Sequence, residues 1–316
     1  MHKFIKKKED IIKWLDNYNI KDFTIDDDPV YGFVVDTKGS VDLSDRKIKN
    51  LPIKFRTVYG YFNYSRNELT TLEGCPDNIY GSFFCMSNNI ENLKYGPKIV
   101  KQSYICEDNP KMTSLLGAVK EVGQSFVCSR CSLINLEGSP EVVGGHFICK
   151  ENKLITLKGS PLSVGGDFNC SKNELTDLFY SPKDMTNNFY KSNSETAVIG
   201  QLISYFDCSH NKLSTLQGIS NTINGILNCS NNKLLNLNYC PFFLRGFIDC
   251  SYNLLQHLYD FPTGPLVEHS IITNNPNLDI GQEYFDINEV RAFIEKERLI
   301  STIKEKNLGK NNLIKI

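Results

Sequence analysis

The sequence predicts a β-rich solenoid of about twelve stacked turns, with a parallel sheet on its concave face and a cap at each end. Three observations predict this fold class. One sequence frame returns every 21 or 22 residues along most of the chain. Each copy places apolar residues at the same positions, and a single copy is too short to bury them alone. Hydrophobic residues make up 41% of the chain, which is too apolar for a disordered protein.

The repeat is followed most easily in its asparagine column. Successive members lie 21 or 22 residues apart, except for one step of 17 residues. The column is Arg46, Asn67, Asn88, Asn109, Cys131, Asn152, Asn173, Ser194, Asn211, Asn232, Asn253 and Asn275. The step after Asn109 contains one extra residue at Pro110–Met112. The 17-residue step indicates an irregular turn near residues 187–202, which either bends the array or carries a loop.

Each column of the repeat has a physical reason. Phe147 and Cys149 stand two residues apart, so both point inward from one short strand. Leu154 and Leu157 follow a corner and also point inward. An Asn at that corner can bond exposed backbone groups of its own turn and of the next, so we expect a ladder of asparagines. Serine recurs directly after the cysteine and indicates a turn-forming position. Gly and Pro recur on the return path, the segment that leads from the Leu positions back to the next strand, and indicate turns there.

The unit Phe-x-Cys-Ser-x-Asn-x-Leu-x-x-Leu resembles a leucine-rich repeat, with Phe and Cys in the two Leu sites of the strand. Cys131 is the substitution that this family tolerates in the Asn column. The resemblance covers about residues 41–280, and the short period with a Pro on the return path looks like the short bacterial class. The narrower pattern is similar to repeat proteins encoded by large bacteriophages and other large DNA viruses. That resemblance implies a host protein as partner, for example a component of antiviral defence that is blocked by steric occupation.

The ends of the chain differ from the repeat, which predicts three segments. Residues 1–40 are expected to form an N-terminal helix plus hairpin cap, with the helix over 8–17. Residues 41–281 form the solenoid. Residues 282–316 form a C-terminal cap helix and tail, opened by a capping box of Asp286 and Glu289. A helix that binds a partner is the alternative for this last segment.

The eleven cysteines are explained by the repeat rather than by disulfides or metal. Eight of them share the inward strand column: Cys85, Cys106, Cys128, Cys149, Cys170, Cys208, Cys229 and Cys250. Parallel neighbours hold such side chains in a poor arrangement for a disulfide. Cys128 and Cys131 form a Cys-x-x-Cys, but both positions belong to the repeat. We therefore expect reduced thiols, a reducing compartment and a cytoplasmic location, which would be the host cytoplasm for a viral protein.

Composition and motifs argue against most chemistry. The net charge is −1, with 35 Lys and Arg against 36 Asp and Glu, so no nucleic-acid footprint is expected. Lys6–Lys8 is interpreted as a solvated helix start, and no apolar run is long enough to cross a membrane. The N-terminus does not resemble a signal peptide. No nucleotide-binding, zinc-protease or nucleophile–base pattern is present, so we expect no enzyme, no cofactor and no metal.

The candidate binding residues are those that the repeat leaves free. The strand position between Phe and Cys faces outward, and in four consecutive turns it is apolar. Later turns place amides and carboxylates there. The predicted partner-binding residues are Phe84, Ile105, Val127, Ile148, Asn169, Asp207, Asn228 and Asp249. The neighbouring position adds Tyr61, His146, Asp167 and Tyr205, and Tyr190 belongs to the irregular turn. The alternative is that Ile and Val stand there because they suit strands.

Two functional classes follow from this pattern. The first is a non-enzymatic interaction module that binds a protein partner on the concave face. The second is a structural or virion-associated spacer that self-assembles through its sheets. The sequence favours the first because of the consecutive apolar positions.

Overall fold

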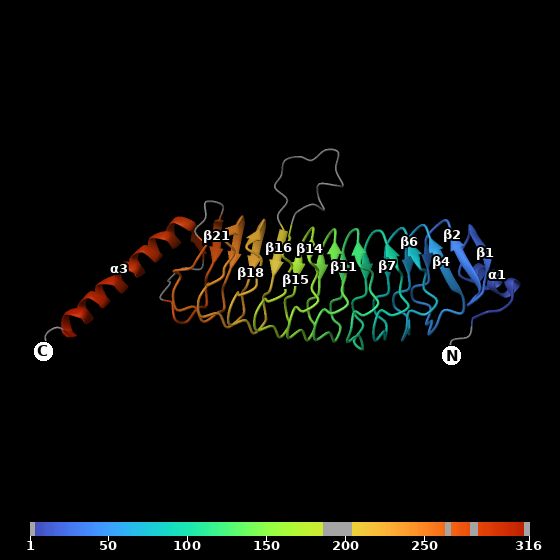
Figure 1. The fold of residues 1–316 in the computed structure, drawn as a ribbon, viewed down its shortest axis with the longest axis horizontal. Coiled ribbons are helices and arrows are strands. Elements are labelled where there is room, and N and C mark those ends of the chain that lie inside the picture. The colour runs from blue at the N-terminus through green and yellow to red at the C-terminus, as the bar shows by residue number, and fades with distance from the viewer. Residues whose placement is uncertain (1–3, 186–203, 263–266, 279–283, 313–316) are drawn as a thin grey trace, which may run out of the picture.

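The computed structural model describes residues 4–185, 204–262, 267–278 and 284–312. Figure 1 shows a long rod of stacked turns, with the N-terminal helix at one end and a long C-terminal helix leaving the other. Most turns contribute one short strand to each of two sheets, which run along the rod as an 8-stranded and a 12-stranded sheet. The chain is therefore a parallel β-solenoid, as the repeat predicts.

The 12-stranded sheet contains the Phe and Cys positions of the repeat. Its strands are β3 (Val41–Asp42), β5 (Phe62–Asn63), β7 (Phe83–Phe84), β9 (Tyr104–Ile105), β11 (Phe126–Val127), β13 (Phe147–Ile148), β15 (Phe168–Asn169), β16 (Ser204–Asp207), β18 (Gly225–Asn228), β20 (Gly246–Asp249), β21 (Val267–Ile271) and β22 (Tyr284–Asp286). Only the pairing of β21 with β22 is antiparallel among the described strand pairs of this sheet.

The 8-stranded sheet begins with the two strands of the N-terminal hairpin and continues along the return path of the repeat, where the sequence analysis expected turns only. Its strands are β1 (Phe23–Asp28), β2 (Gly32–Thr37), β4 (Lys54–Val58), β6 (Asn78–Ile79), β8 (Ile99–Val100), β10 (Glu121–Val122), β12 (Val142–Val143) and β14 (Ser163–Val164). Further along the rod, β17 (Thr222–Ile223) and β19 (Phe243–Leu244) form a separate 2-stranded sheet.

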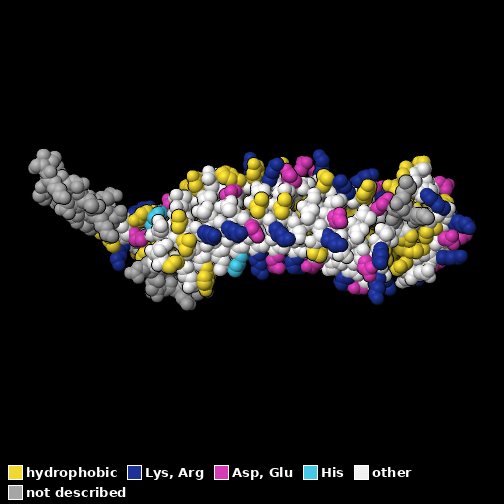
Figure 2. All heavy atoms as spheres, turned by 90° about the horizontal axis from the view of Figure 1, so that it is seen from below, with side chains coloured by type: hydrophobic (Ala, Val, Ile, Leu, Met, Phe, Trp, Pro, Cys, Tyr) yellow, Lys and Arg dark blue, Asp and Glu magenta, His cyan; other side chains and the backbone are white. Residues whose placement is uncertain are grey.

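The second sheet removes the curvature that the sequence analysis expected. Figures 1 and 2, which differ by a quarter turn, both show a nearly straight rod. Curvature of a solenoid comes from a small rotation at each repeat. Here strands form both walls of most turns and stack at the same spacing of about 4.8 Å, so neither wall is wider than the other. The expectation of a concave face is therefore wrong, and the predicted site lies on a flat sheet face.

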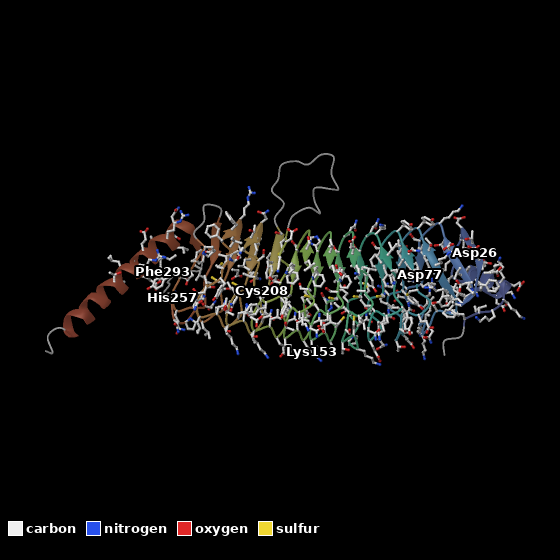
Figure 3. The ribbon with its side chains drawn as sticks, viewed as in Figure 1. Asp26, Asp77, Lys153, Cys208, His257 and Phe293 are labelled. Carbon is white, nitrogen blue, oxygen red and sulfur yellow. The ribbon has the colours of Figure 1, made fainter. Side chains whose placement is uncertain are left out.

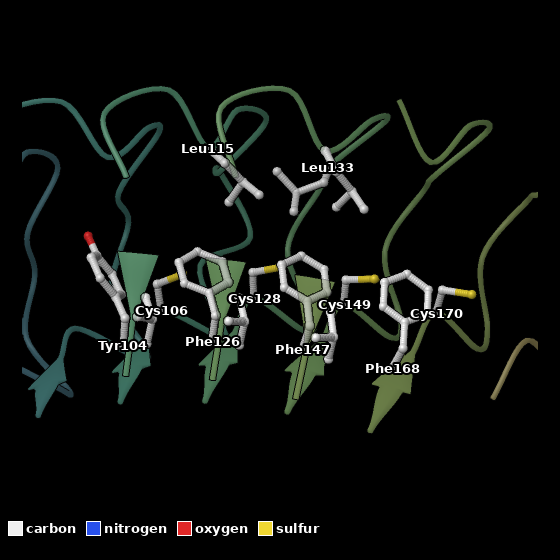
Figure 4. Packing of buried hydrophobic residues seen from close by; sticks show 14 of the residues in the cluster. Tyr104, Cys106, Leu115, Phe126, Cys128, Leu133, Phe147, Cys149, Phe168 and Cys170 are labelled. Carbon is white, nitrogen blue, oxygen red and sulfur yellow. The ribbon is translucent and has the colours of Figure 1, made fainter. Parts of the chain in front are cut away.

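The core is a set of continuous side-chain ladders between the two sheets. Figure 4 shows the aromatic ring and the cysteine of each strand pointing to the same side, toward the Leu positions of the turn. Neighbouring rings such as Phe126 and Phe147 stack with centroids 5.6 Å apart and an interplanar angle of 10°. Val143 and Val164 close the core from the second sheet, and both are buried. Each turn thus buries its apolar side chains against its neighbours, as the repeat requires.

The predicted asparagine ladder is present. Asn88 is typical: its Nδ2 donates to the carbonyl of Tyr64 in the preceding turn at 3.0 Å, and its Oδ1 accepts from the N–H of Leu69 at 3.1 Å. The same pattern holds at Asn67, Asn109, Asn152, Asn173, Asn211, Asn232, Asn253 and Asn275. At Cys131 the thiol makes only longer contacts, of 3.5 and 3.7 Å, to backbone carbonyls.

The irregular step of the repeat is an insertion, not a turn. Strand β15 pairs directly with β16, with Phe168 opposite Phe206. The ladder also passes directly across this junction, because Asn211 Nδ2 donates to the carbonyl of Cys170 at 3.1 Å. No turn therefore stacks between these two strands, and the assignment of a turn to Ser194 is wrong. Residues 187–202, with Tyr190, lie outside the described residues.

The N-terminal segment packs against the first turns. Helix α1 (Lys8–Asn17) spans the residues expected to be helical, and its Ile11 and Leu15 are buried in the common core. Strands β1 and β2 form an antiparallel hairpin that continues into β4.

The C-terminal segment contacts the last turns in a similar way. Helix α3 (Ile287–Asn312) buries Val290 and Ile294 in the core, with Phe293 packed beside them (Figure 3). Its Arg298 donates to the carbonyl of Tyr259 at 3.2 Å. The side chain of Asp286, in the predicted capping box, lies outside the described residues.

Candidate partner-binding face

The predicted apolar residues lie side by side on the outer face of the 12-stranded sheet. Phe84 is opposite Ile105, Ile105 is opposite Val127, and Val127 is opposite Ile148 in the strand register. All four side chains are partly exposed, whereas the aromatic residue before each and the Cys after each are buried. These four residues form a continuous apolar surface along the sheet, which we call the apolar stripe.

The apolar stripe is extended by an aromatic ring at its N-terminal end. Tyr61 lies one strand earlier and contacts Phe84 edge to face, with ring centroids 6.2 Å apart. Tyr61 is 40% exposed. Met86, which follows the cysteine of the same turn as Phe84, is partly exposed as well. Aromatic residues and methionine are enriched in the centres of protein interfaces, so this end of the stripe has the composition of a contact surface.

The polar half of the predicted site has a local structural role. Asn228 Oδ1 accepts hydrogen bonds from both the N–H and the hydroxyl of Ser230, at 3.1 and 2.7 Å. Asp249 accepts the same two bonds from Ser251, at 3.0 and 2.6 Å. These are Asx-turns, in which a short polar side chain bonds the backbone two residues on. In the described part of the chain, six turns use this device, at Asp42, Asn63, Asn169, Asp207, Asn228 and Asp249.

The Asx residues also bond one another across strands. Asn169 Nδ2 donates to Asp207 Oδ2 at 3.2 Å, and Asp207 is 8% exposed. Asn228 Nδ2 donates to the hydroxyl of Tyr205 at 3.0 Å. Burial raises the pKa of Tyr205, while the bond from Asn228 acts in the opposite direction. The recurring serines therefore form turns, as predicted. The Asn and Asp residues recur at the outward position largely because they accept the hydrogen bonds of those turns.

A second polar ladder runs beside the stripe, and the sequence analysis did not recognise it. The N–H of Asp167 donates to His146 Nδ1 at 3.0 Å, and the N–H of Tyr205 donates to Asp167 Oδ1 at 2.9 Å. Ser82 and Ser103 make similar bonds in earlier turns, to the N–H of the next member. His146, Asp167 and Tyr205 were expected to widen the binding surface, and the structure shows that they also connect successive turns. The recurrence of serine at this position was the available signal.

Charged side chains form inter-turn pairs at the corner before the Asn ladder. Arg66 bonds Asp45 across one turn, at 2.6 Å, and Lys172 pairs with Glu151 at 3.3 Å. Figure 2 shows Lys and Arg interspersed with Asp and Glu along the side of the rod that it faces. Such exposed pairs contribute little to stability individually, and their mixed signs leave no extended single-sign stretch on that side.

The cysteines are inert packing residues in this arrangement. All eleven are free thiols, and all but Cys240 are buried. Burial raises the pKa of Cys131 to about 11 and that of Cys75 to about 12, so neither is a reactive thiolate. Among the described residues, no group of three or more His, Cys, Asp or Glu is placed to hold a metal ion. No helix in the described part of the chain is long and apolar enough to cross a membrane.

The fold defines a class of protein: a two-sheet parallel β-solenoid with leucine-rich-repeat-like turns and an asparagine ladder. No family model matches the sequence, and no curated protein matches it. Among solved structures, the chain is similar to YopM from Yersinia enterocolitica WA-314, with 15% identity and a TM-score of 0.23. The match covers 74% of this chain but only 64% of that one. At this score the overall folds do not superimpose, so the class follows from the repeat geometry of this chain itself.

Proposed function

We propose that this protein is a non-enzymatic interaction module that binds a protein partner on the outer face of its 12-stranded sheet. One observation carries the proposal. Six turns place Asn or Asp at the outward strand position and gain an Asx-turn, whereas four consecutive turns place Phe84, Ile105, Val127 and Ile148 there. The fold is stable with a polar residue at this position, so strand formation does not require the apolar ones. A consecutive apolar stripe is then best explained by contact with a partner.

The partner's surface is expected to match both halves of the face. An apolar ridge would fill the stripe, while donors such as Arg or amide groups would reach the exposed atoms of Asn228 and Asp249. Asp207 is nearly buried and bonded within the sheet, so it contributes less than the sequence analysis expected. The finer expectation of a host defence protein blocked by steric occupation depends on the viral resemblance, and identification of the partner tests it.

The experiment compares capture of a partner by wild type and by Phe84→Asp/Ile105→Asp. Asp is the residue that Asp207 and Asp249 place at the same position, so the variant is expected to keep the fold. The matched control is Ile134→Asp/Ile155→Asp, which changes two exposed neighbouring isoleucines, 52% and 60% exposed, outside the stripe. A partner that is captured by wild type and by the control, and lost by the stripe variant, supports the proposal.

Equal capture by all three proteins would refute the stripe as the site. A chain that captures only itself, with a size that rises with concentration, would favour the self-assembling spacer instead. The contacts at the ends of the rod argue against end-to-end stacking. Ile11 and Leu15 of α1 occupy one end of the core, and Val290 and Ile294 of α3 occupy the other. We therefore propose that residues 1–40 and 282–316 serve as caps of the solenoid at residues 41–281.

We also propose that the protein works in a reducing compartment such as the cytoplasm. The support is the buried ladder of free thiols, which has no disulfide and whose pKa values burial raises. Mass measurement of the protein taken directly from cells, after alkylation without reductant, tests this proposal. Eleven alkylated cysteines are expected, and any intramolecular disulfide would contradict it.

A further inference from the structure

The apolar stripe is a straight row of side chains with a constant spacing. Its members occupy the same outward position of β7, β9, β11 and β13, and these strands pair without a shift in register. Figure 4 shows the strands of Tyr104, Phe126 and Phe147 side by side. Neighbouring members of the stripe are therefore about 4.8 Å apart, and the stripe is about 14 Å long. Each strand is two residues long, so only a partner element that lies along the rod contacts the whole stripe.

An amphipathic α-helix along the rod matches this spacing. Apolar residues that alternate three and four positions apart recur about every 5.2 Å along a helix axis. Over the length of the stripe, the row on the helix and the row on the sheet therefore differ by only about 1 Å in total. In an extended peptide, side chains on one side recur about every 6.7 Å, so they fall between members of the stripe. The spacing favours a helix over an extended segment.

The outward side chains directly beside the stripe are small. Ser82, Ser103 and Ser125 precede the buried aromatic residue in three successive turns of the stripe, and we call them the serine row. Tyr61 and Tyr205 stand at the same position in other turns. The N–H of Ser103 donates to Ser82 Oγ at 3.3 Å, and the N–H of Ser125 donates to Ser103 Oγ at 3.4 Å. A helix over the serine row can therefore approach the sheet closely, and it covers hydroxyls that already have partners.

The face becomes negatively charged beyond the C-terminal end of the stripe. Asp167, Asp207 and Asp249 stand at outward positions of the turns that contain β15, β16 and β20. The outward positions of these turns and of the β18 turn hold no Lys or Arg in the described part of the chain. Asp207 is nearly buried, so Asp167 and Asp249 supply most of the exposed charge. His146 contacts Asp167 but accepts its N–H through Nδ1, so the ring carries no charge in this geometry.

We propose that the partner presents an amphipathic α-helix that lies along the rod, with its apolar residues on the stripe and basic residues over the acidic turns. This inference rests on the function proposed above and names the part of the partner that fills the site. About 10 residues of helix cover the stripe, and about 13 more reach Asp249. A second copy of this chain is the rival occupant, but its own stripe is followed by carboxylates and not by basic residues.

The test measures the fluorescence anisotropy of labelled synthetic peptides with the full chain. The probe is a helical peptide of about 24 residues, with Leu three and four positions apart in one half and Arg in the other, on an Ala and Gln background. One comparison peptide has the same composition with Leu at every second position, and another has Glu in place of Arg. The probe is expected to bind at least tenfold more tightly than either, and to weaken at high salt.

Three variants locate the bound helix. Phe84→Asp/Ile105→Asp is expected to raise the Kd of the probe at least tenfold. Ser103→Tyr is also expected to raise it at least tenfold, because the ring fills the serine row; the fold should tolerate it, since Tyr occupies the same position in other turns. Asp249→Asn is expected to raise the Kd about threefold and to keep its turn, as Asn228 does. The matched control, Ile134→Asp/Ile155→Asp, is expected to stay within about twofold of wild type.

No binding of the probe, or equal binding of the peptide with Leu at every second position, would refute the helix. A mass of the chain that rises with concentration, and that Phe84→Asp/Ile105→Asp reduces, would overturn it in favour of a second copy. Capture of the native partner separates this inference from the proposed function. A partner that the stripe variant loses and Ser103→Tyr retains would show that the stripe is the site but that no helix lies over the serine row.

Discussion

Alkaline pH should unfold this protein through its buried thiols. The eight cysteines of the inward column are fully buried, and burial raises the pKa of thiols such as Cys85, Cys106 and Cys128 well above its usual value of 9.0. In the unfolded chain the same thiols ionise near pH 9. The folded state therefore binds more protons than the unfolded state above that pH. Stability from these groups is complete below about pH 9 and is lost as the pH rises further.

The magnitude follows from the linkage between proton binding and unfolding. With an unfolded pKa of 9.0, one thiol that stays protonated in the folded state costs about 0.8 kcal/mol of stability at pH 9.5 and about 1.4 kcal/mol at pH 10. For the column together this is about 7 kcal/mol at pH 9.5 and about 11 kcal/mol at pH 10. The whole free energy of unfolding of a typical domain is about 5–15 kcal/mol, so unfolding is expected between these pH values or shortly above them.

Urea unfolding at pH 7 and at pH 9.5, followed by circular dichroism in the presence of reductant, measures this loss. The informative variant replaces half of the column with alanine: Cys85, Cys106, Cys128 and Cys149. The variant should be less stable at pH 7, because cavities form in the core. Its further loss between pH 7 and pH 9.5 should be about two thirds that of wild type, because burial also raises the thiol pKa of Cys75, Cys131 and Cys240, which the variant keeps. An equal loss in the two proteins, or thiolate absorbance appearing before unfolding, would refute the reasoning.

Three further predictions concern stability and are measured by the same urea titrations at pH 7. Cys131→Asn should restore the asparagine ladder and stabilise the protein by about 1–2 kcal/mol. Asn152→Cys should destabilise it by about 2–4 kcal/mol. Changes of the opposite sign would contradict a stabilising role of the ladder. Tyr104→Phe should stabilise the protein by about 1 kcal/mol, because the buried hydroxyl of Tyr104 has no hydrogen-bond partner among the described residues. The control Tyr205→Phe removes a hydroxyl that accepts a hydrogen bond from Asn228, so it should not stabilise the protein. Gly144→Ala should cost about 3 kcal/mol or more, since its Cβ would collide with the preceding turn, and a neutral result would disprove that packing.

The sequence predicts the repeat so well because each turn makes the same contacts as its neighbours. The extra residue after Asn109 illustrates this. Met112, displaced by one position from the usual Leu site, is still fully buried, and Leu115 follows it into the core. The insertion was therefore read correctly from spacing alone. The same spacing argument failed at Ser194, because 38 residues fit two short turns as well as one turn plus an insertion. Only the direct pairing of Phe168 with Phe206 separates the two possibilities.

The second sheet was missed for a related reason. From β6 onward its strands are two residues long, as at Ile99–Val100 and Val142–Val143, and one of those two residues faces outward. Two residues are too few to show the alternation that marks a strand in a sequence. Whether they form a strand depends on pairing with the neighbouring turn. The glycines after these strands were interpreted as turn residues. The structure shows that Gly123 and Gly144 are required by the close approach of successive backbones.

The outward strand position shows how a regular fold leaves room for function. The residues that point inward are constrained by core packing. The Asn residues are constrained by the hydrogen bonds that they make to backbone groups. Neither set therefore indicates which partner the protein binds. At the outward position, Asn or Asp gains a bond to the serine two residues later, and that bond is the local optimum of the fold. All four stripe residues give up this bond. The residues two positions after Phe84, Ile105 and Ile148 are Met, Glu and Lys instead of Ser, whereas Val127 keeps Ser129. Two columns therefore change together in three of the four turns, which strand propensity at the outward position alone does not explain. The partner contact proposed for the apolar stripe would account for both changes.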